Sequence, residues 1–170
     1  GAVTLLAPAG WQGRALALPL LLPLFVPEDV RPAVGDLRVV VLDVGQGLAV
    51  HVQTAGHDLL FDTGPRYGSD ADAGERLVLP YLRAAGVARI DTLIVSHADS
   101  DHSGGAASVL YGLPVGDVLS SVPMQDALRL MRRDTRDCAA GQRWLADGVE
   151  FLMLHPPPGA RERGARSSNA

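Results

Sequence analysis

The chain has 170 residues, 47% of them hydrophobic and 20% charged, which is the composition of a folded protein of about one domain and excludes a disordered chain. Its formal net charge is −4 and all fifteen basic residues are arginines, so overall charge gives no general attraction to a polyanion such as DNA. Cys138 is the single cysteine, which excludes an intrachain disulfide and a thiolate zinc site, and we expect it to be an inert thiol.

The first 27 residues are apolar, with Arg14 as their only charged residue. Residues 15–26 form a wholly apolar run, but twelve residues are fewer than the ~20 that span a bilayer as a helix, and Pro19 and Pro23 each remove a backbone donor. We interpret residues 1–27 as the end of a membrane-embedded region, with a processed leader or a buried core helix as the alternative. Because the sequence opens on Gly1, we expect it to be an excerpt of a longer protein.

Residues 28–36 have the composition of a short linker, and a domain begins at residue 37. The hydrophobic pattern predicts an early group of strands at 37–43, 48–53 and 58–62, with a hairpin turn at 56–58. It then predicts a helix at 75–85, a buried strand at 90–96, a helix from 106, a strand at 115–120, a helix at 124–133 and a hairpin at 144–154 turned by Asp147-Gly148. Strands followed by strand and helix alternation indicate an α/β layered fold.

Four arginines lie within eight residues, at Arg129, Arg132, Arg133 and Arg136. On the predicted helix at least three of them would gather on one side. This pattern is typical of a solvated helix face, and a phosphate-contacting patch is the alternative.

A dense group of polar side chains follows the predicted buried strand at 90–96. Within six residues His97, Asp99, Asp101 and His102 offer two imidazoles and two carboxylates, which suit zinc, manganese or iron. The carboxyl end of such a strand is where α/β folds expose polar side chains to a ligand. A loop that only caps the next helix would account for one Asp or Ser, for which Ser103 is already placed, but not for two histidines. The sequence therefore predicts a metal site here.

This segment also carries a family resemblance. Residues 96–105, SHADSDHSGG, resemble the signature loop of the metallo-β-lactamase superfamily, whose usual form is His-x-His-x-Asp-His, with Asp99 in place of the second His. Together with LDVGQG at 42–47 and FDTG at 61–64, this variant resembles the extracytoplasmic domain of ComEC-type DNA-uptake proteins, where that domain follows a membrane channel region. The resemblance runs from about Leu37 to Pro158. It implies an αββα sandwich, of which residues 37–170 would be the first half.

The resemblance implies two divalent ions, zinc or manganese, with His97 and Asp99 on one and Asp101 and His102 on the other. In an extended or irregular segment side chains two apart share a face, which would permit this division. Asp101 and His102 would also be catalytic, and Asp99 would favour manganese because it makes one site harder. Asp62 would brace the loop and orient an imidazole, although an Asx turn before Gly64 is an equal explanation.

The remaining candidates are weaker. Asp43 and Gln46 are placed to line the rim of the site, but turn formation is sufficient to explain both. His155, before three prolines, is either a third ligand or, as we favour, a structural residue. We expect His51 and His57 to be surface residues.

The function implied by the resemblance is that of a channel protein for DNA uptake in natural transformation. It would lie in the bacterial inner membrane, with residues 37–170 extracytoplasmic and DNA, the membrane and other competence proteins as partners. The domain would be a metal-dependent hydrolase that cleaves phosphodiesters of the non-transported strand. Another hydrolase of the superfamily, or a non-catalytic DNA-binding or gating domain, is the alternative. Because later His and Asp ligands of the superfamily are missing, we expect this chain by itself to be inactive.

Overall fold

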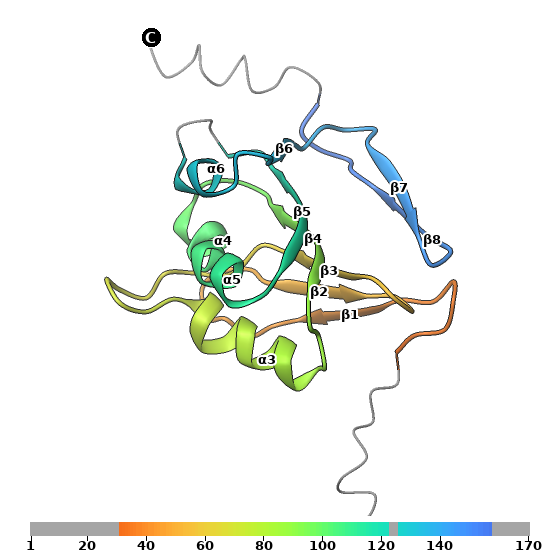
Figure 1. Ribbon diagram of the computed structural model, residues 1–170. Helices are drawn as coiled ribbons and strands as arrows, with labels where there is room; N and C mark the ends of the chain where they lie inside the picture. Colours follow the sequence, from red (N-terminus) through yellow and green to blue (C-terminus); the bar gives the residue numbers. More distant parts are fainter. Residues whose placement is uncertain (1–30, 123–125, 158–170) are drawn as a thin grey trace, which may run out of the picture. The chain divides into compact units, whose positions relative to one another are not determined.

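The computed structural model describes residues 31–122 and 126–157, which include one six-stranded mixed sheet (Figure 1). Strands β1 to β3 pair antiparallel and β3 to β6 pair parallel, in the spatial order β1-β2-β3-β4-β5-β6. Their bounds are β1 Arg38–Val41, β2 Val50–Gln53, β3 Asp58–Phe61, β4 Ile90–Val95, β5 Val115–Ser120 and β6 Arg136–Asp137. The α/β class predicted from the strand and helix alternation is confirmed.

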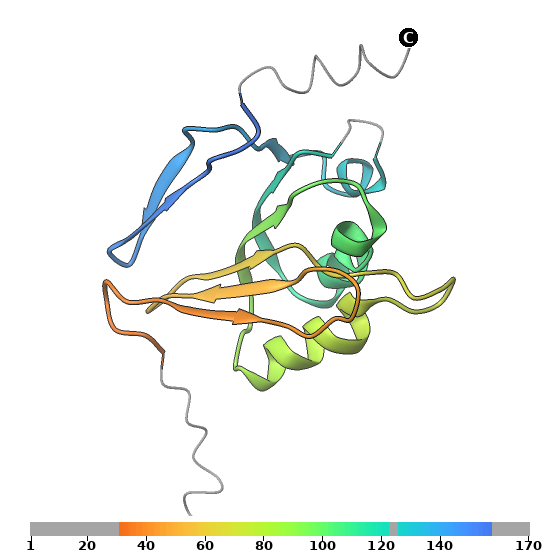
Figure 2. The same ribbon diagram turned by 180° about the vertical axis from the view of Figure 1, so that it is seen from behind.

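Helices cover one face of this sheet and a hairpin lies against the other, as Figures 1 and 2 show from opposite sides. The helical elements are the π-helical turn η3 Gly74–Val78, its continuation α3 Leu79–Ala84, α4 Ser100–Ser103, α5 Ala106–Gly112 and α6 Ala127–Met131. The hairpin consists of β7 Arg143–Ala146 and β8 Val149–Leu152, and Asp147 and Gly148 turn it with positive φ, as their sequence predicts. The sequence analysis missed α4 and β6, which are only four and two residues long.

The two faces of the sheet follow from the period of two along each strand. Buried aliphatic side chains face the helices and form the main core, with Leu60, Leu82, Leu93, Val95, Val109 and Val118 at most 2% exposed. The opposite face carries a smaller cluster in which Leu59, Ile94, Leu119 and Cys138 are buried against Trp144 and Phe151 of the hairpin. Strand β4 is buried on both sides, which explains its nearly continuous apolar sequence.

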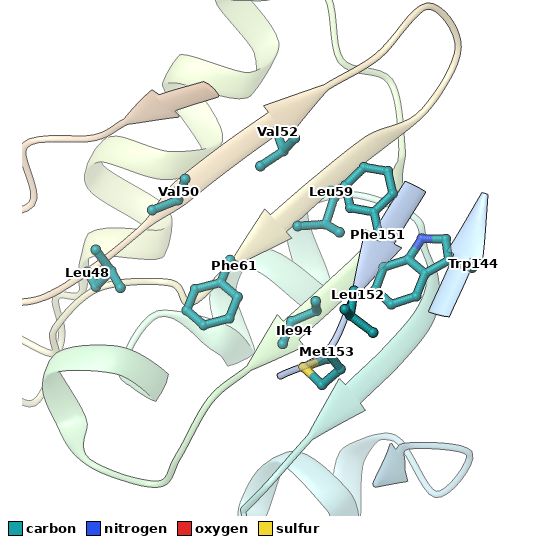
Figure 3. A pocket seen from close by; sticks show the side chains of 10 residues that line it. All are labelled: Leu48, Val50, Val52, Leu59, Phe61, Ile94, Trp144, Phe151, Leu152 and Met153. Atoms are coloured by element: carbon teal, nitrogen blue, oxygen red, sulfur yellow. The ribbon is translucent and has the colours of Figure 1, made fainter. Parts of the chain in front are cut away.

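The hairpin covers its face of the sheet only in part. An apolar groove of about 380 Å³ remains between the two, lined by side chains of β2 to β4 and of the hairpin (Figure 3). Trp144 and Phe151 stack at its wall with ring centroids 5.2 Å apart. Beyond the groove, Val39 and Val41 of the edge strand β1 are 53% and 65% exposed. This face therefore offers apolar surface that the described residues leave uncovered.

His51 corrects one prediction. It is 1% exposed, whereas we expected a surface residue. It lies on the helix-facing side of β2, where its Nδ1 is 3.1 Å from the hydroxyl of Tyr81 and its Nε2 is 3.0 Å from Oδ1 of Asp58. Asp58 also accepts hydrogen bonds from Arg31 at 2.6 Å and from Gln53 at 3.2 Å. Burial is tolerated because each polar atom of the imidazole has a partner. His57 is half-buried, with 21% of its side chain exposed.

The arginine cluster corrects a second prediction, because α6 ends at Met131 and the four side chains do not share one helix face. Arg129 is buried, donates to the carbonyls of Ser120, Val122 and Thr135 and pairs with Asp137. Arg132 donates to the carbonyls of Val115 and Gly116. Arg136 pairs with Asp117 at 2.8 Å. Three of the four arginines therefore connect the segment around α6 to β5 and β6.

The apolar segment at 1–27 lies outside the described residues, as do residues 28–30 of the predicted linker. Among residues 31–122 and 126–157, no helix has both the length and the apolar character that crossing a bilayer requires. The described part of the linker is held to the sheet and to the hairpin, because Arg31 pairs with Asp58 and the amide of Gly35 donates to the carbonyl of Asp147 at 2.7 Å.

The network around Asp58 generates a prediction about acid stability. Burial penalises the charge of Asp58, but hydrogen bonds from His51, Arg31 and Gln53 outweigh this, and the pKa of Asp58 lies below its ordinary value. A carboxyl group with a lowered pKa in the folded state stabilises the fold above its unfolded pKa, and this stabilisation is lost as the pH falls through the folded value. We expect Asp58→Asn to cost about 1–3 kcal/mol near neutral pH, with a difference from wild type that narrows below about pH 4.

Urea denaturation at several pH values measures this difference. Asp36→Asn, at an exposed carboxylate, is the matched control and should stay close to wild type throughout. A penalty for Asp58→Asn that is the same at acid and neutral pH would contradict the role assigned to the Asp58 carboxylate.

Candidate metal centre

The candidate site lies where two parallel neighbouring strands end. Strands β3 and β4 pair in parallel with Phe61 opposite Ile94, so the residues that follow them meet at the same edge of the sheet. The amide of Asp62 donates to the carbonyl of Ile94 at 2.8 Å, which continues the pairing by one residue. Asp62 is thereby placed beside the start of the segment that contains the predicted metal ligands.

Asp62 is fully buried and binds both ends of that segment. Its Oδ1 accepts from the amide of Ser96 at 2.7 Å, and its Oδ2 accepts from the Ser96 hydroxyl at 2.8 Å and lies 2.7 Å from Nδ1 of His102. Its φ of 58° lies in the left-handed region, which Asp and Asn enter more readily than most residues. The next residue also holds His102 in place. Both the backbone amide and the side-chain hydroxyl of Thr63 donate to the carbonyl of His102.

The segment from Ser96 is irregular up to Asp99 and then enters the short helix α4. Asp99 is extended, with ψ of 141°, but α4 begins at Ser100 and turns Asp101 and His102 back toward His97. The capping alternative is not realised, because the Asp99 side chain makes no cap hydrogen bond and the Ser103 hydroxyl donates to the carbonyls of Ala98 and Asp99. The carboxylate of Asp99 is therefore not used to hold the helix end.

Three side chains converge at this turn. Donor atoms of His97, Asp101 and His102 all lie within 4.8 Å of one another. Nε2 of His102 is 3.6 Å from Oδ2 of Asp101, and the two imidazole centroids are 4.0 Å apart. The side chains are 45%, 43% and 22% exposed in sequence order, so the cluster opens to solvent. Two imidazole nitrogens and a carboxylate oxygen form a donor set that fits zinc or a similar divalent ion.

The donors are grouped differently from the two pairs implied by the family resemblance. His97 lies with Asp101 and His102, whereas Asp99 is 77% exposed and outside that group. Oδ2 of Asp99 is nevertheless 3.4 Å from Nε2 of His97. All four predicted ligands thus lie at one turn, and their division between ions stays a prediction.

The other candidate residues are not among the three converging donors. Asp43 accepts from the amide of Gly45 at 3.3 Å, which is the turn-forming explanation, and Gln46 is exposed in the same turn. His155 is exposed and is not among the three converging donors.

Two contributors were missed by the sequence analysis. Ser96 contacts both Asp62 and His97. Gly47, with φ of 154°, packs so closely that a Cβ there would lie 2.4 Å from the carbonyl oxygen of Asp101. The glycines at 45 and 47 were a usable signal for close approach of two backbone segments. The role of Ser96, in contrast, depends on the pairing of β3 with β4.

The fold and the site can now be compared with known proteins. The metallo-beta-lactamase superfamily matches residues 42–159. The chain belongs to this superfamily. Superfamily membership implies metal binding, and the cluster of His97, Asp101 and His102 fits that expectation.

Two relatives of this chain are named as a competence protein and a recombination protein. The chain is 42% identical over 158 residues to Competence protein ComA of Neisseria gonorrhoeae, which covers 91% of this chain and 20% of that protein. It is 36% identical over 119 residues to Recombination protein 2 of Haemophilus influenzae, covering 70% of this chain and 14% of that protein. The resemblance to ComEC-type competence proteins is confirmed, and the chain spans a fifth or less of the length of these two relatives.

A solved structure supports the fold alone. A metallo-β-lactamase of Cronobacter sakazakii with a HARLDQ motif aligns with a TM-score of 0.52 and 20% identity, over 76% of this chain and 52% of that one.

The geometry of Asp62 predicts its effect on metal affinity. Asp62→Asn replaces an oxygen that faces the His102 ring and should weaken zinc binding about 10–100-fold, the usual range for loss of a partner that orients a ligating imidazole. Asn tolerates the positive φ of this position, so the fold should persist. Competition against a zinc chelator measures the affinity, with Asp70→Asn in an exposed loop as the control. Wild-type affinity in a folded Asp62→Asn variant would refute the orienting role.

Proposed function

We propose that this chain carries the first half of the metal-dependent hydrolase domain of a bacterial DNA-uptake protein and that the substrate of that domain is a phosphodiester of the non-transported DNA strand. The convergence of His97, Asp101 and His102 at the carboxyl edge of β3 and β4 is the observation that carries this proposal. The homology to competence proteins supports DNA as the substrate.

The proposed metal ligands are His97, Asp99, Asp101 and His102, which lie at one turn. We propose two divalent ions, zinc or manganese, with His97 and Asp99 on one and Asp101 and His102 on the other. A bound divalent ion supplies an acidified water and neutralises charge on phosphodiester oxygens. We propose that Asp101, whose side chain is 43% exposed, is also catalytic and that its carboxylate accepts a proton from an attacking water.

Residues of this chain orient and group the proposed ligands before a substrate binds. The buried Asp62 fixes the plane of the His102 ring through Nδ1, so its Nε2 is left for a ligand. Because the donors are already grouped, little reorganisation is required when a cation binds. The partial exposure of the donors leaves one side open for a phosphate group.

The surrounding fold supports a larger arrangement. We propose that the sheet and its helices are the first half of an αββα sandwich and that β7 and β8 begin the second sheet. The apolar groove and the exposed Val39 and Val41 support this, because contiguous exposed apolar surface is typical of a face that packs against another element. We further propose that residues 1–27 end a membrane-embedded region, that the domain is extracytoplasmic, and that the membrane and other competence proteins are partners.

Metal binding by the 170-residue chain is the first test. Titration with Zn²⁺ and Mn²⁺ should show binding by wild type and binding weakened at least about tenfold by His102→Ala, since one imidazole ligand is lost. His155→Ala, which removes an exposed imidazole outside the cluster, should bind as wild type does.

Cleavage is the second part of the same test. The full-length protein that carries this domain should degrade end-labelled single-stranded DNA, and His97→Ala and Asp101→Ala should abolish degradation while the domain stays folded. DNA binding without cleavage would contradict the proposal in favour of a gating role. Hydrolysis of a thioester or a lactam in place of DNA would contradict it in favour of another superfamily activity.

A further inference from the structure

Ser96 lies between the last residue of β4 and the first histidine of the cluster, and its polar atoms have three close partners. Its amide donates to Oδ1 of Asp62 at 2.7 Å and its hydroxyl donates to Oδ2 of Asp62 at 2.8 Å. The same hydroxyl oxygen is 2.8 Å from Nδ1 of His97. Ser96 is therefore a bridge between a buried carboxylate and an imidazole that the carboxylate does not itself contact.

The direction of these hydrogen bonds assigns the tautomer of His97. A serine hydroxyl has one proton, and here it is donated to Asp62. Toward His97 the oxygen can only accept, so Nδ1 of His97 must carry the proton and Nε2 must carry the lone pair. His102 is assigned the same tautomer without a bridging residue, because its Nδ1 faces an oxygen of the Asp62 carboxylate.

We infer that Ser96 is a positioning residue that extends the control of Asp62 to His97, so that one buried carboxylate sets both imidazoles to present Nε2 to the metal site. The inference rests on the proposed metal site and adds a role for a side chain that is not itself a ligand. The structure around the rings agrees with it: Nε2 of His97 is the atom near Asp99 and Nε2 of His102 is the atom near Asp101. We call the path from Asp62 through Ser96 to His97 the hydrogen-bond relay. The unprotonated Nε2 atoms of His97 and His102 thus each lie beside a carboxylate donor.

The tautomers can be read directly in the metal-free chain by ¹⁵N NMR of the imidazole rings, at about pH 8, where an ordinary histidine is neutral. In wild type both His97 and His102 should show a protonated Nδ1 and an unprotonated Nε2. Ser96→Ala should remove this signature from His97 and leave it on His102, whose bond to Asp62 does not pass through the serine. Ser96→Thr keeps a hydroxyl and should restore the signature on His97.

Zinc affinity of the same variants supplies the second readout. Ser96→Ala should weaken binding about tenfold and Ser96→Thr should recover most of the loss. Ser100→Ala is the matched control, because it removes a serine hydroxyl from the same segment at an exposed position. The amide of Ser96 still bonds to Asp62 in every variant, so the fold should be retained, and the dispersion of the amide spectrum checks this.

Two results would overturn the relay: a wild-type His97 protonated at Nε2, or a folded Ser96→Ala variant with the wild-type His97 tautomer and zinc affinity. Failure of the proposed function has a different signature, since the NMR measurement needs neither metal nor DNA. If the wild-type chain shows the expected tautomers but binds no zinc, the metal site is refuted while the hydrogen-bond relay is supported.

Discussion

The carboxylate of Asp62 is the group on which the arrangement of the site depends. A buried carboxylate is costly unless hydrogen bonds replace its hydration. Asp62 is fully buried, and three groups supplied by Ser96 and His102 meet this need. The segment between these two residues is therefore fixed at both ends by the same side chain. Everything that the cluster does, from grouping its donors to orienting its rings, follows from this constraint.

Close packing of backbone segments around the cluster also holds it in position. The two glycines before α5 allow this segment to approach the first residue of η3 and the residues after β3. A Cβ at Gly105 would lie 2.5 Å from the amide nitrogen of Gly74 and 2.5 Å from the carbonyl of Thr63. A Cβ at Gly104 would lie 2.3 Å from the amide nitrogen of Arg66. Movement of the cluster away from Asp62 would require these backbone contacts to separate. The glycines of the sequence motif thus serve packing, whereas its histidines and aspartates serve ligand binding.

Much of the framework was predictable because it depends on local pattern. The apolar run of β4, the Asp-Gly turn of the last hairpin and the density of donors at 97–102 are all visible without tertiary contacts. The failures have a common cause, which is that they depend on partners distant in sequence. His51 alternates with Val50 and Val52 in a strand, yet its burial required Asp58 and Tyr81 to satisfy its ring. The arginines near α6 were assigned to a helix face, but their partners are carbonyls of β5 and its surroundings. The role of Ser96 required the parallel register that places Asp62 beside it.

The central claim is that Asp62, directly and through Ser96, leaves Nε2 of both imidazoles for metal binding. Anomalous diffraction at the zinc edge, from crystals of the zinc-loaded chain, locates the ion and its ligand atoms directly. We predict zinc bound through Nε2 of His97 and through Nε2 of His102, with carboxylate oxygens of Asp99 and Asp101 as further ligands and Asp62 still bonded to Nδ1 of His102. Zinc bound through Nδ1 of either histidine, or zinc held by other residues with this cluster empty, would contradict it.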